Sequence, residues 1–281
     1  MAEPLNRRAF IGRGAAAVAA GLAGPAVTAC LGPAPELSTR ASPRLTARPL
    51  APTVTATPGL TRLGLASGRD GLLYVPQGYS SDTAWPLVVG LHGAGGSSDD
   101  WSSYLTRAEQ RGMVFMAPDS RYGSWNVAGY AWGADVDFVD AALAHTFQRC
   151  RIDPARVALA GFSDGASCAL WLGLINGDLF THVIAYSPGL LILGASAVGK
   201  PPIFISHGSL DQVFPVTVTR DQIVPQLRDA GYDVTYLEFA GDHAVPAAVS
   251  EAALDWFFGA APPPGGDRRR AIADARGGAT R

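Results

Sequence analysis

One serine in the chain lies in a context that could make it a nucleophile. Ser163 is the centre of the G-x-S-x-G pattern of residues Gly161–Gly165. An aliphatic run of strand length, residues 156–160, precedes the pattern, and good helix formers, residues 166–172, follow it. A serine on a tight strand-to-helix turn is held clear of the sheet, and the free N–H groups of the helix face negative charge that develops beside it. The pattern indicates acyl transfer at Ser163; the alternative is a glycine-rich turn with an incidental serine.

A serine hydroxyl is a weak nucleophile and requires a base, usually a histidine that a carboxylate orients. Of the five histidines, His145 falls in a predicted helix and His182 begins a predicted strand. His92 and His207 each precede a glycine at a strand end, where we expect them to brace loops. His243 follows the last predicted strand and is downstream of a good candidate acid, so it is the predicted base.

The predicted acid is Asp211, which lies in the loop after the apolar run 202–206. From there a carboxylate can face a histidine on the neighbouring loop. The order Ser163, Asp211, His243 is the order that a nucleophile elbow of this kind requires. Asp242 is the alternative acid, but a carboxylate directly before a histidine in sequence usually points elsewhere.

An oxyanion intermediate requires two N–H donors that are already in place. One predicted donor is the backbone N–H of Asp164, directly after the serine. The second is expected from the glycine-rich loop 92–96, with Ala94 preferred and Gly95 as the alternative. This loop lacks the lysine and the spacing of a phosphate-binding P-loop.

Apolar runs of strand length alternate with helical patterns between residues 60 and 259, which predicts an α/β three-layer sandwich on a mostly parallel sheet. The expected strands are residues 71–76 (an edge strand), 86–91, 113–117, 156–160, 183–186, 202–206 and 234–239. The expected helices are residues 101–111, 135–149, 166–172, 217–230 and 247–258. The ligand crevice should lie at the carboxyl ends of the strands.

In this order the motifs resemble those of the α/β-hydrolase superfamily across nearly all of residues 60–259. Within it the chain is similar to phospholipase/carboxylesterase and polyhydroxybutyrate-depolymerase-like serine esterases. The resembling stretches are Leu91–Gly96, Ile152–Pro154, Gly161–Gly165, His207–Gly208 with Asp211 and Pro215, and His243. Asp164 and Ala166 depart from the family, which tends to carry glutamine and glycine there.

The resemblance implies ester hydrolysis in two steps. Ser163 would attack the carbonyl, His243 would take its proton, and Asp211 would hold the imidazolium. Water would then release the acyl group. A serine peptidase or thioesterase on the same fold, and a surface lipoprotein without catalysis, are the alternatives.

The expected substrate is a small or polymeric carboxylic ester. About fifteen residues join the strands 183–186 and 202–206, too few for a helical lid of ordinary size, so we expect no sizeable lid and an open crevice. Trp101, Trp125 and Trp132 could line it; the alternative is that such aromatics are core or surface residues. An open crevice favours short acyl, aromatic or polyester-type esters over long lipids.

The N-terminus has the pattern of an export signal. Arg7 and Arg8 form a twin-arginine pair ahead of a weakly hydrophobic run, and residues 1–30 end in a stretch that resembles a bacterial lipoprotein box. There Cys30 would be lipidated; an ordinary cleavage site is the alternative. The expected location is outside the bacterial inner membrane, either periplasmic, lipid-anchored at the cell surface or secreted, with membrane contact only through Cys30.

Both ends of the chain differ in composition from its middle. Residues 31–59 are rich in proline and predict an unpacked tether, and residues 260–281 predict a disordered tail. The net charge of −2 and the lack of a basic stripe argue against a nucleic-acid partner. No spacing suggests a metal or another cofactor, and Cys150 and Cys168 give no disulfide framework.

Overall fold

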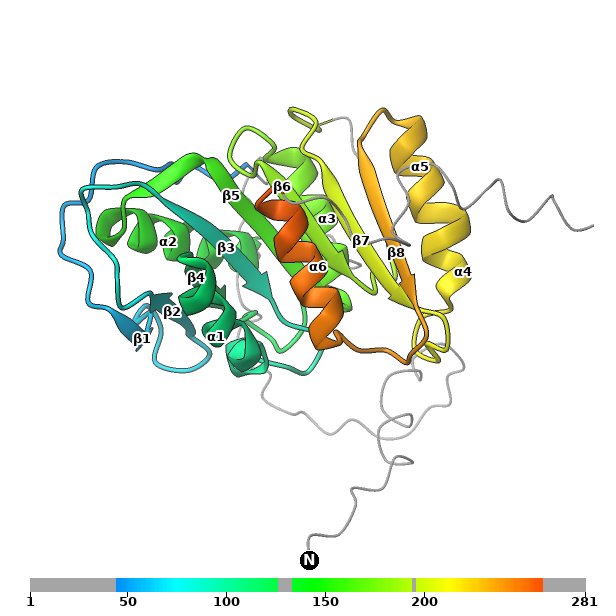
Figure 1. The fold of residues 1–281 in the computed structure, drawn as a ribbon, viewed down its shortest axis with the longest axis horizontal. Helices are drawn as coiled ribbons and strands as arrows, with labels where there is room; N and C mark the ends of the chain where they lie inside the picture. The colour runs from blue at the N-terminus through cyan, green and yellow to red at the C-terminus, as the bar shows by residue number, and fades with distance from the viewer. Residues whose placement is uncertain (1–43, 126–132, 194–195, 260–281) are drawn as a thin grey trace, which may run out of the picture. The chain divides into compact units, whose positions relative to one another are not determined.

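The computed structural model describes residues 44–125, 133–193 and 196–259. In this part of the chain one sheet has eight strands in the order β1-β2-β4-β3-β5-β6-β7-β8. β2 pairs antiparallel with both β1 and β4, and the other neighbours are parallel (Figure 1). The strands are β1 Gly59–Arg62, β2 Gly71–Val75, β3 Trp85–Leu91, β4 Val114–Pro118, β5 Ile152–Phe162, β6 His182–Tyr186, β7 Ile203–Gly208 and β8 Val234–Phe239.

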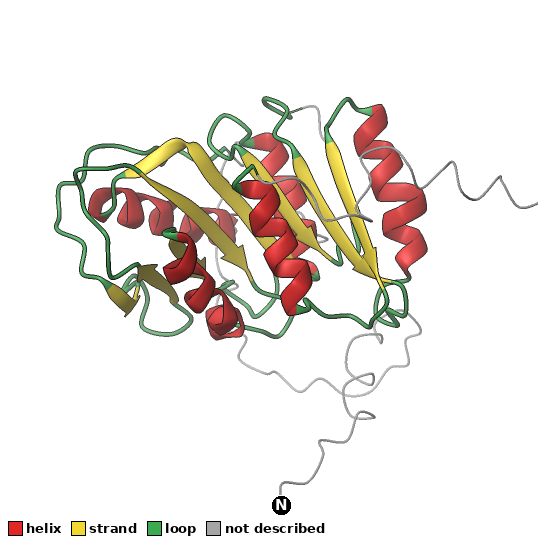
Figure 2. Ribbon diagram, viewed as in Figure 1, coloured by secondary structure: helices red, strands yellow, loops and turns green. Residues whose placement is uncertain are grey.

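Helices cover both faces of the sheet, which gives the predicted three layers (Figure 2). Side chains of α1 and α6 pack on one face, and those of α2, α3 and α5 pack on the other. The helical segments are η2 Ser98–Trp101, α1 Ser102–Arg111, α2 Gly133–Arg149, α3 Asp164–Ile175, α4 Val216–Val218, η3 Thr219–Ile223, α5 Val224–Asp229 and α6 Ala247–Phe257. The described residues between β6 and β7 contain no helix.

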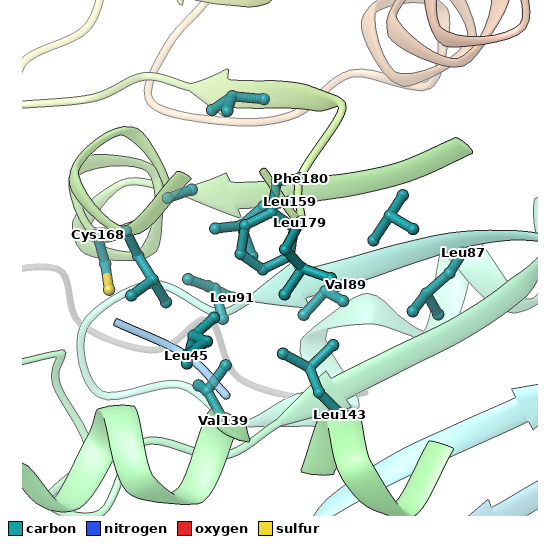
Figure 3. Close-up of a cluster of buried hydrophobic side chains, with 14 of the residues drawn as sticks. Leu45, Leu87, Val89, Leu91, Val139, Leu143, Leu159, Cys168, Leu179 and Phe180 are labelled. Atoms are coloured by element: carbon teal, nitrogen blue, oxygen red, sulfur yellow. The ribbon is translucent and has the colours of Figure 1, made fainter. Parts of the chain in front are cut away.

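The central strands carry apolar side chains on both faces because helices cover them on both sides. Leu87, Val89 and Leu91 of β3 pack with α2 and α3, whereas Val88 packs on the opposite face with α1 and α6. Figure 3 shows the first of these clusters, with Leu159 of β5 beside the β3 side chains. The core therefore holds β3 and β5 rigidly, and these two strands end at the glycine-rich loop and at Ser163.

The fold class is confirmed, and several boundaries differ from the expectation. The strand at 71–76 is not at the edge, because β1 (Gly59–Arg62) pairs outside it. β1 was missed because it is short and its side chains are largely exposed. The helix expected at 217–230 is a run of three segments with a π-helical turn, Thr219–Ile223, in its middle.

Residues 44–58 correct the expectation of an unpacked tether over 31–59. Leu45 is 2% exposed, and its N–H donates to Asn176 Oδ1 at 2.8 Å. Thr46 and Ala47 donate their N–H groups to Asp140 Oδ1 at 2.8 and 2.9 Å. Asp140 of α2 and Asn176 at the end of α3 thus hold this segment against the domain, so the packed chain begins before residue 59.

Other sequence expectations lie partly outside the described residues. The signal segment with Cys30 and the tail 260–281 belong to the part that the structure does not describe. Cys150 and Cys168 are both buried and unpaired. Among the described helices, none has the length and hydrophobicity needed to cross a bilayer.

Candidate active site

Ser163 stands on a strained turn between β5 and α3. Its backbone has φ 59° and ψ −116°, a conformation that side chains with a Cβ rarely adopt. A Cβ at Gly161 would lie 2.1 Å from the carbonyl oxygen of Gly165, and a Cβ at Gly165 would lie 2.2 Å from that of Leu91. Only glycine at both positions lets the backbone turn this tightly, which is why the pattern is G-x-S-x-G.

The turn brings Ser163 next to two side chains from later loops. His243 Nε2 lies 2.8 Å from Ser163 Oγ, and His243 Nδ1 lies 2.6 Å from Asp211 Oδ2. Asp211 follows β7 and His243 follows β8, so both come from the carboxyl ends of parallel strands. The three residues selected from the sequence therefore form one continuous hydrogen-bonded chain.

The surroundings of Asp211 favour its charged form. Burial alone would raise the pKa of this carboxyl group, but hydrogen bonds from His243 and from the backbone of Phe214 and Val213 outweigh burial, so the pKa lies below its ordinary value. The two backbone N–H groups donate to Oδ1 at 2.8 and 2.9 Å. Oδ2 is thereby left to face the imidazole of His243.

The alternative acid, Asp242, is exposed, and no hydrogen bond or ion pair of its side chain is found within the described ranges. Of the other histidines, His92 has the loop-bracing contacts that the sequence predicted for it. His92 donates from Nδ1 to Gly93 O at 2.7 Å and accepts the N–H of Ser120 at 3.0 Å. Burial lowers the pKa of His92, in keeping with an imidazole that is neutral.

One predicted oxyanion donor, Asp164, directly follows Ser163, and the other, Ala94, lies in the glycine-rich loop. Among the described residues, no acceptor is hydrogen-bonded to the backbone N–H of Asp164 or Ala94. Gly95, the alternative to Ala94, donates its N–H to Gly123 O at 2.6 Å. The glycine-rich loop lies against the elbow, because a Cβ at Gly93 would be 3.5 Å from Ser163 Cβ.

Arg69 braces this loop, which the sequence did not indicate. Its guanidinium donates to the carbonyl oxygens of Gly96 and Ser120 at 2.6 and 2.5 Å, and Nη2 lies 3.1 Å from His92 Nε2. One side chain from the turn before β2 therefore ties together the loops that follow β3 and β4. No sequence signal could have selected it, since a lone arginine in a turn is ordinarily solvated.

Asp164 stands where the resembling esterases tend to carry glutamine, and its side chain binds the loop after β4. Its Oδ2 accepts Ser124 Oγ–H at 2.6 Å and Trp125 N–H at 2.7 Å. Burial raises the pKa of Asp164 above its ordinary value, and these hydrogen bonds only partly offset that effect. The carboxylate thus connects the first turn of α3 to the loop after β4.

The indoles expected to line the crevice are interior residues, which corrects that expectation. Trp101 is 5% exposed and packs against Tyr104 and Phe115. Trp125 is 2% exposed and donates its Nε1–H to His92 O at 2.8 Å. Both rings pack in the fold, as the alternative allowed, and Trp132 lies outside the described residues.

Two phenylalanines flank His243 instead. The ring centroids of Phe162 and Phe214 lie 4.8 and 5.6 Å from that of the imidazole. Their sequence positions carried a usable signal, because Phe162 precedes the serine and Phe214 lies three residues after Asp211. The described residues hold no group of three His, Cys, Asp or Glu side chains suited to a metal ion.

Comparisons with known proteins agree with this architecture. A family model described as Phospholipase/Carboxylesterase matches residues 135–248. A protein named "Probable feruloyl esterase C" from Aspergillus terreus is 29% identical over 160 residues, which cover 53% of this chain and 57% of that protein. The chain thus spans little more than half the length of this relative.

Solved structures of esterases share the fold. Esterase PE8 is 26% identical, with a TM-score of 0.57 over 67% of this chain and 97% of its own. The acetyl xylan esterase from Aspergillus awamori is 19% identical, with a TM-score of 0.56 over 71% of this chain and 99% of its own. By strand order, family model and these structural neighbours, the chain has the α/β-hydrolase fold.

Proposed function

We propose that the protein hydrolyses carboxylic esters with Ser163 as nucleophile, His243 as general base and acid, and Asp211 as the carboxylate that orients His243. The observation that carries the proposal is the hydrogen-bonded chain from Ser163 Oγ through His243 to Asp211 Oδ2 at 2.8 and 2.6 Å. It connects a hydroxyl to a base, and the base to a charged acceptor, which is what serine activation requires.

The proposed reaction has two halves. Ser163 Oγ attacks the ester carbonyl while His243 Nε2 takes its proton, and the alcohol leaves with that proton. Water then attacks the acyl-enzyme with the same base, which releases the acid and restores Ser163. The N–H groups of Asp164 and Ala94 stabilise the oxyanion in each half, since within the described part of the chain neither donates to a protein acceptor.

The proposed substrates carry short acyl, aromatic or polyester-type acyl groups. Phe162 and Phe214 beside His243 offer apolar surface at the reacting atoms, and the described residues between β6 and β7 form no helix that would close over them. The names of the feruloyl and acetyl xylan esterases support small or aromatic acyl groups in particular.

A substrate panel tests the proposal. We expect hydrolysis of p-nitrophenyl acetate, p-nitrophenyl butyrate and methyl ferulate, and loss of turnover in Ser163→Ala at unchanged melting temperature. A fluorophosphonate probe should label the wild type and not Ser163→Ala. Peptide cleavage without ester hydrolysis would assign the triad to a different bond, preference for p-nitrophenyl palmitate would contradict an open site, and absence of labelling would reject the nucleophile.

We further propose that the protein is exported and acts outside the inner membrane. The twin arginines Arg7 and Arg8 and the lipoprotein-like stretch ending at Cys30 support this. In a bacterial host with a twin-arginine pathway, Arg7→Lys with Arg8→Lys should leave the chain in the cytoplasm. Cys30→Ala should release the protein from the membrane fraction. Equal membrane association of the wild type and the Cys30→Ala variant would exclude the lipid anchor.

A further inference from the structure

A second histidine lies against the carboxylate of Asp211. His207, on β7, has a fully buried side chain. Its Nε2 is 3.0 Å from Asp211 Oδ2, the same oxygen that faces His243, and 2.9 Å from the carbonyl oxygen of Phe214. Its Nδ1 is 2.8 Å from Thr219 Oγ1, at the start of the π-helical turn.

The two oxygens beside Nε2 of His207 decide whether that nitrogen carries a hydrogen. The carbonyl oxygen of Phe214 can only accept, and so can Asp211 Oδ2 when the carboxyl group is ionised. Hydrogen bonds to Asp211 keep its pKa below the ordinary value, so it is ionised at neutral pH. Two acceptors against one buried nitrogen would be unfavourable without a donor between them, so Nε2 must carry the hydrogen.

The same hydrogen acts on Asp211 along a second route. The carbonyl oxygen of Phe214 accepts from His207, and the backbone N–H of the same residue donates to Asp211 Oδ1 at 2.9 Å. The ring of Phe214 packs on His243. His207 therefore contacts Oδ2 directly and stabilises the residue that holds Oδ1.

We propose that His207 is a positioning residue of the triad, whose Nε2–H holds the Asp211 carboxylate so that Oδ2 faces His243. Among the described residues, the polar contacts of the His207 ring are to Phe214, Thr219 and Asp211 and not to Ser163, so its effect on the reaction passes through Asp211. Its kinetic consequence rests on the proposed ester hydrolysis, whereas its hydrogen-bonding claim does not.

The hydrogen-bonding claim is tested by NMR on the full chain labelled with ¹⁵N-histidine at pH 7, with the signals of His207 assigned from their loss in His207→Gln. We expect Nε2 of His207 to be protonated and its proton resonance to move in Asp211→Asn, which alters the facing oxygen. A bare Nε2, or a resonance unaffected by Asp211→Asn, would overturn the proposal whether or not the protein hydrolyses esters.

The kinetic claim is tested with variants at position 207. His207→Met keeps the bulk and removes the donor, and we expect kcat to fall about tenfold to hundredfold with KM within about twofold, since a misplaced catalytic group costs rate without changing substrate binding. His207→Gln places an amide N–H near the position of Nε2 and should restore most of kcat. His207→Asn is too short to do so and should not.

His182 provides the matched control, because it begins β6 and packs edge-to-face against Trp256 and Phe257. His182→Met should leave kcat unchanged. If His207→Met does not fold, the Gln and Asn pair decides. Equal kcat in folded Gln and Asn variants, or an unchanged kcat in folded His207→Met, would overturn the proposal. Turnover in the wild type no higher than in Ser163→Ala would instead reject the proposed function, and the NMR result would still stand.

Discussion

The Asp211 carboxylate is charged although burial opposes its charge, and it faces Nδ1 of the His243 imidazole. Replacing the carboxylate by an amide keeps the shape of the side chain but lets it donate toward His243 Nδ1, which favours the wrong tautomer. We expect Asp211→Asn to lower kcat about 10⁴-fold. Steady-state hydrolysis of p-nitrophenyl butyrate is the measurement.

Asp242→Asn is the control for this experiment, because Asp242 adjoins His243 in sequence and is exposed. The activity of this variant should stay within about twofold of the wild type, because substitutions of exposed residues without buried contacts usually have small effects. A larger loss in Asp242→Asn than in Asp211→Asn would reverse the assignment of the acid.

At the scale of single residues, the side chains that meet at the serine were predictable because each belongs to a loop that follows a strand. Parallel strands bring such loops to one edge whatever the details of packing. Arg69 and Ser124 were not predictable, because their contacts depend on loop conformations that no periodic pattern encodes. Trp101 and Trp125 were placed wrongly, since aromatic type does not distinguish a pocket wall from a core.

At the scale of elements, the join between β5 and α3 depends on the absence of a side chain at Gly165. A Cβ there would lie 2.2 and 2.4 Å from the carbonyl oxygens of Leu91 and His92. Since both are backbone atoms of a buried strand end, the strand or the helix would have to shift. We expect Gly165→Ala to lower the free energy of unfolding by about 3 kcal/mol or more and to abolish turnover.

Urea unfolding followed by circular dichroism measures this loss. Gly68→Ala is the matched control, because no atom lies within 4 Å of its Cβ position and its backbone is not left-handed. It should unfold within about 0.5 kcal/mol of the wild type. A Gly165→Ala variant of wild-type stability would show that the elbow is not as tight as described.

Asp164 makes the tie between α3 and the loop after β4 sensitive to pH. Burial holds its folded-state pKa above the ordinary value of 3.8. Stability from this group is therefore complete below that ordinary value and is lost as the pH rises through the higher folded-state pKa. We expect Asp164→Asn to remove this loss, so that unfolding free energy at pH 7 minus that at pH 4 is larger in the variant.

The measurement is urea unfolding of both proteins at the two pH values. Asn keeps an oxygen that can accept from Ser124 or Trp125, so the comparison isolates the charge. An equal difference between pH 7 and pH 4 in the two proteins would mean that ionisation of Asp164 does not oppose folding.

The succession of elements was predictable because strongly apolar strands and periodic helices fill most of residues 60–259. The failures have local causes. β1 lies at the edge with exposed side chains, so it lacks the apolar run of the central strands. The π-helical turn at Thr219–Ile223 cannot be recognised from hydrophobic periodicity. The extra residue in that turn displaces the spacing of apolar side chains by less than this spacing varies between ordinary helices.

At the scale of the whole molecule, residues 44–58 extend the domain beyond the chain segment that looks globular. Their polar anchor is Asp140, which accepts two backbone N–H groups and the Thr46 hydroxyl at 2.6 Å. Removing this carboxylate leaves three donors unsatisfied, so we expect Asp140→Ala to lower the free energy of unfolding by about 1–3 kcal/mol. Activity at 25 °C should be unchanged, because Asp140 binds residues 46 and 47 and none of the three residues of the proposed triad.

Thermal and urea unfolding measure the loss, with Asp233→Ala as the control because Asp233 is exposed. Limited proteolysis gives an independent readout: cleavage within residues 44–58 should be faster in Asp140→Ala than in either other protein. Equal cleavage and equal stability in all three would mean that the segment contributes nothing to the domain. The proline content predicted an unpacked tether here. Composition shows that a segment lacks apolar periodicity, but it does not show that distant side chains accept hydrogen bonds from its backbone.

The backbone conformation at position 163 costs free energy, and the proposed role of Ser163 as nucleophile gives a reason for that cost. A backbone at φ 59° and ψ −116° is readily accessible to glycine, and it is unfavourable by about 1–3 kcal/mol for any residue with a Cβ. Ser163→Gly should therefore melt above Ser163→Ala, even after the greater freedom of unfolded glycine is counted. Differential scanning calorimetry of the two inactive proteins would show it. Selection for thermal stability alone would therefore favour glycine at this position. The protein would become more stable and would lose the hydroxyl group of its proposed nucleophile.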